Sequence, residues 1–191
     1  GKHDSILGLS TAGGGGHLNA LNAIKAEYFK QNPLGDFRDI DIIKNSFPCY
    51  SHKLIGRLIK NWDDAKKRGD IKAQERILQG KIFGISRRRW SDIVFFIPVF
   101  LSTFFTLLFD RKITHIVDTQ PVAATAVIRA ARLVNWLFHR KISVLKVMTD
   151  FPSSEAIHFA HPAKLLTKND KKIFRLVATV PFKKMTGESA N

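Results

Sequence analysis

The spacing of apolar residues changes along the chain, and these changes predict alternating strands and helices. A short apolar run, Ser5–Ser10, indicates a buried strand, and four consecutive glycines follow it closely. Apolar residues then recur at three- and four-residue intervals, which is typical of one face of an α-helix. The residues with this spacing are Leu18, Leu21, Ile24 and Tyr28. We expect this helix to begin at His17 and to stop before Asn32.

Further strands and helices are expected along the rest of the chain. The strands are expected at residues 37–43, 113–118, 142–149, 164–167 and 176–180. A helix rich in alanine is expected over 121–138, and a helical turn at 169–174. The run at 142–149 is nearly continuous in apolar residues, as central parallel strands tend to be. This alternation predicts a doubly wound, mostly parallel, Rossmann-like α/β sheet in a single domain over residues 1–191.

A long insertion over residues 50–110 interrupts the alternation. Its first part, residues 51–92, reads as helical and basic, with twelve Lys and Arg against five Asp and Glu. The next 17 residues, 93–109, carry no charge and are rich in Phe. Three interpretations of this run stay open: a membrane-spanning helix, a buried helix of the α/β core, and an interfacial helix. In the third, the residues at the lipid headgroups are Arg87, Arg88, Arg89 and Trp90.

The excess of positive charge narrows the class of partner. The chain has 31 Lys and Arg against 16 Asp and Glu, a net charge of +15. Such an excess points to phosphates, nucleic acid or anionic lipid. No helix-turn-helix, RNP, KH or zinc pattern accompanies the charge, which argues against nucleic acid. Because the basic segment adjoins the Phe-rich run, anionic membrane lipid is the expected partner, with a solvated helical face as the alternative.

The cysteine content and the first residues indicate the compartment. The single cysteine, Cys49, excludes an intramolecular disulfide and fits a reducing environment, and we interpret it as a passive thiol. No cleavable signal peptide is visible, because the first apolar run is short and is followed by glycines. We therefore expect a cytoplasmic protein that is peripheral at a membrane face.

The glycine run is the strongest candidate site, and it consists of Gly13, Gly14, Gly15 and Gly16. Consecutive glycines cost backbone entropy, so the position needs close approach of a ligand or unusual dihedral angles. The helix that follows would offer unpaired N–H groups and the positive end of its dipole to an anion such as phosphate. The spacing fits neither a P-loop nor a dinucleotide-binding fingerprint, because Lys25 lies too far away and Leu18 or Asn19 replaces the last glycine.

His17 stands at the expected start of the helix, directly after the glycines. The helix dipole at that position favours the neutral imidazole, which suits a base or a hydrogen-bonding group. The alternative is a structural turn in which His17 is only a cap residue.

Two carboxylates stand at the ends of expected strands. Asp118 precedes the helix at Pro121, and we interpret it as the capping carboxylate of that helix. Asp150 follows the strand at 142–149, where either a cap or a functional group is expected. His158 and His161 are three residues apart but lack a third ligand, so no metal site is predicted.

Three segments, in order along the chain, carry a resemblance to a known family. The first is residues 9–17, LSTAGGGGH, and the last is residues 147–151, VMTDF, followed by His158 and by His161 before a proline. Residues 113–121, ITHIVDTQP, lie between them. Together they resemble the monogalactosyldiacylglycerol synthase and processive diacylglycerol glucosyltransferase family, which is related to the lipid II-forming N-acetylglucosaminyltransferase.

The resemblance implies the amino-terminal half of a GT-B fold, with the active cleft between two Rossmann-like domains. In that family the amino-terminal domain touches the membrane and takes the lipid acceptor, while the other domain holds the nucleotide sugar. By position, the glycines and His158 would bind donor phosphates or acceptor, and His17 and Asp150 would be the catalytic residues. We therefore expect a nucleotide sugar as co-substrate, a lipid or other hydroxyl acceptor, and no further cofactor.

The chain ends at Asn191, before the donor-binding domain of the family. We therefore expect an acceptor-side domain of a hexosyltransferase that does not transfer sugar by itself. The alternative is a non-catalytic module with a glycosyltransferase-like fold, which docks on anionic membrane or on a protein partner.

Overall fold

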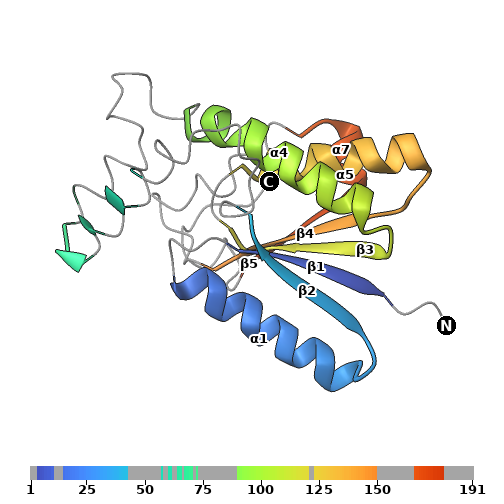
Figure 1. Ribbon diagram of the computed structural model, residues 1–191, viewed down its shortest axis with the longest axis horizontal. Coiled ribbons are helices and arrows are strands. Elements are labelled where there is room, and N and C mark those ends of the chain that lie inside the picture. The colour runs from blue at the N-terminus through green and yellow to red at the C-terminus, as the bar shows by residue number, and fades with distance from the viewer. Residues whose placement is uncertain are drawn as a thin grey trace, which may run out of the picture.

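A computed structural model describes residues 4–10, 15–42, 90–120, 123–149 and 166–178, together with ten residues between 57 and 72. Strands and helices alternate through the described segments (Figure 1). The strands are β1 (Ser5–Ser10), β2 (Asp36–Asp41), β3 (Ile113–Asp118), β4 (Ser143–Met148) and β5 (Phe174–Ala178). The helices are α1 (Gly15–Gln31), α4 (Trp90–Phe109), α5 (Ala124–Phe138) and α7 (Lys168–Ile173).

The five described strands form one parallel sheet in the order β2-β1-β3-β4-β5. This confirms the predicted doubly wound, Rossmann-like arrangement. The chain moves outward from β1 to β2, and after α4 it returns to the other side of β1 to add β3, β4 and β5. The order therefore reverses between β1 and β3. In sheets of this kind, ligands bind beyond the carboxyl ends of the strands at such a reversal.

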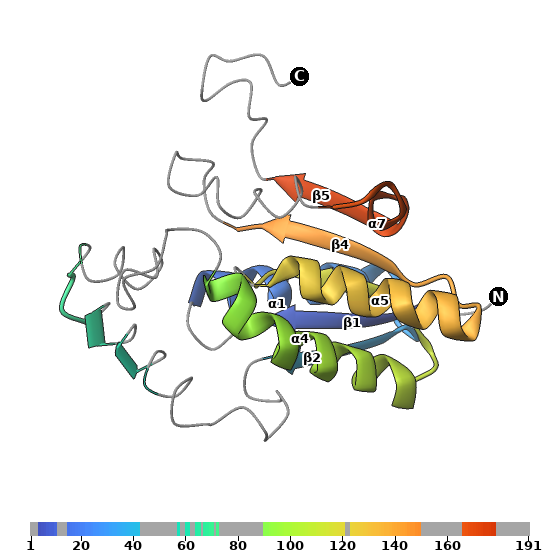
Figure 2. The ribbon, with the colours of Figure 1, turned by 90° about the horizontal axis from the view of Figure 1, so that it is seen from above.

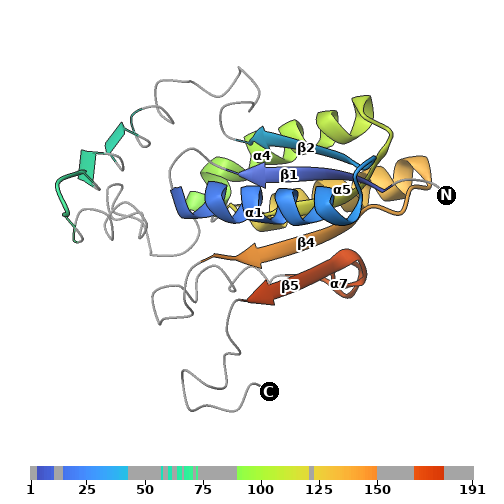
Figure 3. The ribbon, with the colours of Figure 1, turned by 90° about the horizontal axis from the view of Figure 1, so that it is seen from below.

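Helices cover both faces of the sheet. α4 and α5 lie side by side on one face, and α1 lies on the other (Figures 1, 2 and 3). The larger core, which includes Leu7, Ile116 and Val144, fills the space under α4 and α5. A smaller core around Leu21 and Phe37 lies under α1. A Cβ at Gly8 would stand 2.8 Å from side-chain atoms of Leu21 and of Phe37, so this glycine allows the close approach of α1.

α4 is the crossover helix between β2 and β3 and packs along α5. Its inner face buries Val99, Thr103 and Leu107, so the interpretation as a helix of the α/β core describes this face. The opposite face is also apolar, because Leu101 lies on the same side as Ile97, which is half exposed. In the described segments, no helix is both long enough and apolar enough to cross a membrane.

The helix after β1 begins earlier than predicted. α1 starts at Gly15, two residues before the expected start at His17, so Gly15 and Gly16 belong to its first turn. Glycine has a low helix propensity and no apolar side chain. The spacing of apolar side chains therefore could not show that these two residues are helical. α5, in contrast, starts later than predicted, at Ala124 and not at residue 121.

The strand predicted at 164–167 is wrong for the residues that the structure describes, Leu166 and Thr167, and 164–165 lie outside the described residues. Thr167 is instead the N-cap of α7. Its hydroxyl accepts the N–H of Asp170, and the Asp170 carboxylate accepts the N–H of Thr167. This capping box fixes the start of α7 and occupies the Thr167 N–H, which a strand ladder would otherwise use. β5 then begins at Phe174, directly after the helix.

Arg132 of α5 binds the same carboxylate, with Nη1 2.7 Å from Asp170 Oδ1, and so ties α7 to its neighbour. Burial alone would raise the pKa of Asp170. The hydrogen bonds from Thr167 and Arg132 and the charge of Arg132 outweigh burial and lower this pKa below its ordinary value. The carboxylate form is therefore favoured in the folded chain.

Candidate functional site at the carboxyl edge of the sheet

Polar groups from three segments meet beyond the carboxyl ends of β1, β3 and β4, next to the reversal of strand order. The first turn of α1 contributes His17, the residues after β3 contribute Thr119, and the residue after β4 is Thr149. Parallel strands all end at the same edge, so residues more than a hundred positions apart in the chain become neighbours here.

His17 and Thr149 form the contact that defines the site. The Nδ1 atom of His17 lies 2.6 Å from Oγ1 of Thr149, across 132 residues of sequence. This brings the glycine segment to the end of β4, immediately before Asp150 in the chain. The contact occupies Nδ1 of the half-buried imidazole with the threonine hydroxyl.

Thr119 holds the end of β1 and the start of α1 together. Its N–H and its hydroxyl each lie 3.1 Å from the carbonyl oxygen of Leu9, and the hydroxyl lies 3.1 Å from the carbonyl oxygen of His17. Sequence reasoning assigned no role to Thr119 or to Thr149. The available signal was a threonine directly at a predicted strand end, where a hydroxyl can bond neighbouring backbone.

Asp118 is not a helix cap, so that prediction is wrong. α5 begins at Ala124, and its N-cap residue, Ala123, makes no side-chain capping bond. The register places Asp118 directly opposite Lys146 on β4, and the Lys146 ammonium lies 3.0 Å from Asp118 Oδ2. Both side chains are buried. The carboxylate thus pairs with a cation on the neighbouring strand. Without this cation, the buried charge of Asp118 would be costly in free energy.

The Asp118–Lys146 pair also holds the backbone after β3. Asp118 Oδ1 accepts the N–H of Gln120 at 3.0 Å, and the ammonium donates to the Gln120 carbonyl oxygen. Burial raises the pKa of the Asp118 carboxyl, while the charge and hydrogen bond of Lys146 and the Gln120 N–H oppose the rise. The side-chain amide of Gln120 is fully buried and has no hydrogen-bond partner within the described structure.

The first turn of α1 is suited to an anion. It contains no acidic residue, so no carboxylate within that turn offsets the positive end of the helix dipole. A Cβ added at Gly16 would meet no atom of the described residues within 4 Å. Packing against the described part of the chain therefore does not require glycine at this position.

Several predicted site residues lie outside the described residues. They are Gly13, Gly14, Asp150, His158, Arg87, Arg88 and Arg89, and Cys49 is also outside. Of the remainder, Gly15, Gly16 and His17 share the first turns of α1, whereas Trp90 is the first residue of α4. Within the described part of the chain, no group of three or more His, Cys, Asp or Glu side chains could hold a metal ion.

Comparisons with protein-family models, with curated proteins and with solved structures found no match to this chain.

Proposed function

We propose that this chain is the acceptor-side domain of a membrane-associated glycosyltransferase, which moves a sugar from a nucleotide donor to a lipid or other hydroxyl acceptor. The supporting observation is the 2.6 Å contact between His17 Nδ1 and Thr149 Oγ1. It joins the two most specific segments of the family resemblance, the glycines with their histidine and the VMTDF segment, at one edge of one sheet.

The chemistry of glycosyl transfer suits the groups at this edge. The acceptor hydroxyl must lose a proton as the bond to the sugar forms, and the imidazole of His17 is a suitable base. The nucleotide diphosphate leaves with its negative charge, which the N–H groups of the first turn of α1 would stabilise. Thr149 would orient the ring, and Asp150, the next residue in the chain, is the second catalytic candidate.

The proposal is tested by measuring sugar transfer with the full-length protein that contains this chain. It would be incubated with a panel of radiolabelled uridine-diphosphate hexoses and detergent-dispersed diacylglycerol, and the extracted lipid would be counted. We expect labelled lipid from at least one hexose, and His17→Ala should lower kcat by about 10²- to 10⁴-fold, the range for loss of a general base.

His115→Ala is the matched control, because His115 is a half-exposed histidine of β3 whose ring lies near Thr114 and Asp4. It should leave the rate within about twofold of the wild type, because distant surface changes have small effects. Equal losses in the two variants, or no labelled lipid from any hexose, would overturn the proposal.

A second candidate function is a non-catalytic module that docks on anionic membrane. The outward face of α4 favours it, because Ile97 is half exposed on a helix whose uncharged run continues to Phe109. Vesicle co-sedimentation of the chain with anionic and neutral liposomes, for the wild type and for Arg87, Arg88 and Arg89 changed to Ala, tests it. Binding that needs anionic lipid and weakens in the triple variant, together with no sugar transfer, would favour this function over the first.

A further inference from the structure

The amino-terminal end of α5 is buried, and no side chain caps it. Its N-cap residue is Ala123, which adopts a left-handed conformation with φ 54° and ψ 35°, whereas most helices start from an extended Ser, Thr, Asp or Asn. Ala126 and Val127 donate their N–H groups to the Ala123 carbonyl oxygen. The N–H groups of Ala124 and Thr125 have no acceptor among the described residues. A buried helix end without partners calls for an explanation.

A second polar group without a partner lies three residues before this helix end. Both Oε1 and Nε2 of the Gln120 side chain are buried, and neither makes a hydrogen bond within the described structure. Three residues of chain span at most about 11 Å, so the amide and the start of α5 are neighbours. The backbone of Gln120 is held at both ends, because Asp118 accepts its N–H and Lys146 donates to its carbonyl oxygen.

The alternation of side chains places the Gln120 amide on the same side of the sheet as α5. In β3, Ile116 belongs to the core under α4 and α5, and Val117 belongs to the core under α1. The Thr119 hydroxyl reaches the carbonyl oxygen of His17 on α1, so the next side chain, that of Gln120, returns to the α5 side. Figure 2 shows α5 beginning beside the arrowheads of the strands.

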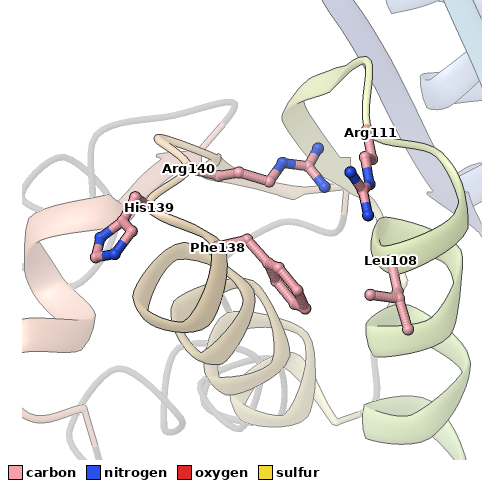
Figure 4. A pocket seen from close by; sticks show the side chains of 5 residues that line it. All are labelled: Leu108, Arg111, Phe138, His139 and Arg140. Carbon is pink, nitrogen blue, oxygen red and sulfur yellow. The ribbon is translucent and has the colours of Figure 1, made fainter.

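At the opposite edge of the sheet, the end of α4 does have a partner. Arg140 extends from the residues after α5 toward α4, beside a hollow of about 280 Å³ (Figure 4). Its guanidinium donates to the carbonyl oxygen of Leu107 in the last turn of α4, and to that of Ile113 at 2.6 Å. One of the chain's own cations thus satisfies this helix end, whereas no described side chain does the same for the N–H groups of α5.

The groups without partners define the chemistry of a ligand. The helix N–H groups and Nε2 of Gln120 are donors, but Oε1 of Gln120 is an acceptor and needs a donor. The buried ammonium of Lys146 is already paired, 3.0 Å from Asp118. A phosphate or carboxylate would therefore meet no free cation here, and it would be repelled by Oε1. An uncharged group with neighbouring hydroxyls suits both kinds of site, because each hydroxyl donates one hydrogen bond and also accepts.

We propose that Gln120 and the first turn of α5 bind an uncharged group that carries neighbouring hydroxyls. Oε1 accepts from one hydroxyl, and the other hydroxyl accepts from Nε2 or from the N–H groups of Ala124 and Thr125. Because these groups are buried, the ligand enters through local opening at the helix start.

In the proposed sugar transfer, two molecules carry such hydroxyls: the hexose of the donor and the glycerol part of the acceptor. The inference rests on the proposed function only for these two sources. The site itself follows from hydrogen-bonding groups that the described residues leave without partners.

The test is an NMR titration of the full-length protein that contains this chain, labelled with ¹⁵N at glutamine, alanine and threonine. The probes are methyl glucoside and methyl galactoside for the hexose, 1-monohexanoylglycerol for the glycerol part, and inorganic phosphate for an anion. We expect at least one neutral probe to shift the signals of the Gln120 amide and of the Ala124 and Thr125 N–H groups in a saturable way. Phosphate should bind at least about tenfold more weakly, because it cannot donate to Oε1 as a hydroxyl does.

Gln120→Met and Thr103→Val form a matched pair, since each removes a buried polar group that has no partner in the described structure. Both should raise the melting temperature by about 2–4 °C, because an apolar side chain of similar size avoids the cost of an unpaired polar group. Only Gln120→Met should weaken binding of the neutral probe, by about tenfold, because hydrogen bonds to the ligand are lost. Thr103→Val, on the inner face of α4, should leave the affinity within about twofold. A purely structural glutamine would change the melting temperature alone.

The outcomes separate this site from the proposed transfer. Saturable binding of no neutral probe, tighter binding of phosphate, or wild-type affinity in Gln120→Met would overturn the inference, even if the transfer assay yields labelled lipid. Binding that is lost in Gln120→Met, without labelled lipid from any hexose, would support the site and overturn only the transfer. Shifts with the methyl hexosides would identify the donor sugar as the source, and shifts with 1-monohexanoylglycerol alone would identify the acceptor.

Discussion

At the carboxyl edge of the sheet, charged and polar side chains bond to one another, whereas at the amino edge Arg111, Lys112 and Trp136 are exposed. Lys146 and Asp118 are both buried and paired, and Thr119 bridges two carbonyl groups. At the other edge Arg111 has no acceptor in the described structure, and Trp136 is largely uncovered.

The direction of the helices accounts for part of this difference. Because α1 follows β1 and α5 follows β3, their amino-terminal ends meet the carboxyl edge, and their carboxyl-terminal ends meet the amino edge. One edge therefore offers N–H groups and the other offers carbonyl groups. Changes at the carboxyl edge should therefore alter stability and site geometry, while changes at the amino edge should have little effect on stability.

The largest effect is expected from Lys146→Met. It leaves the Asp118 carboxyl buried without its cation, which should cost about 3–5 kcal/mol in the free energy of unfolding measured with urea. Adding Asp118→Asn should recover much of this loss, because the pair is then neutral and Asn can still accept the Gln120 N–H. If the double variant is no more stable than Lys146→Met, the pair does not act as a unit.

A moderate effect on the free energy of unfolding is expected when low pH protonates Asp170, a buried carboxylate that belongs to neither edge. Its pKa in the folded chain is below its ordinary value of about 3.9, so its contribution to stability is complete above about pH 4–5. The contribution is lost as the pH falls through the folded pKa. Urea unfolding between pH 6 and pH 2.5 should show this loss, and Asp170→Asn should reduce the slope.

A smaller effect is expected from Thr119→Val, which should cost about 1 kcal/mol because one hydroxyl and its bonds are lost. Thr114→Val is the control at the other end of β3, where the same hydroxyl chemistry reaches the Ser5 carbonyl at 3.2 Å. Both variants should lose similar stability, but only the first should shift the NMR signals of the His17 ring. Equal shifts of the His17 signals in the two variants would mean that Thr119 positions His17 no more than Thr114 does.

The smallest effect on stability is expected at the amino edge. Trp136→Ser should change the free energy of unfolding by less than about 0.5 kcal/mol, because the side chain is largely uncovered in the fold. Thermal unfolding followed by circular dichroism measures this. A loss above about 2 kcal/mol would show that Trp136 is part of the core.

Much of the fold could be predicted because strand and helix periodicities are local. Ile113–Asp118 was predicted with its observed bounds, and the strands at 37–43 and 142–149 were placed within two residues at each end. The strand at 164–167 was wrong because a capping box at Thr167 took precedence over the apolar pattern. In the candidate site, the glycines and His17 were singled out by their unusual composition.

The sequence by itself determined the parallel α/β class, the segment that begins α1, and the excess of positive charge, because each follows from residue type and local spacing. Only the tertiary structure decided that Asp118 pairs with Lys146, that Thr149 meets His17, and that Arg111 converges with Arg140. Such pairs depend on strand order and register, which place residues 28 or 132 positions apart within hydrogen-bonding distance. No local pattern of apolar and polar residues carries that information.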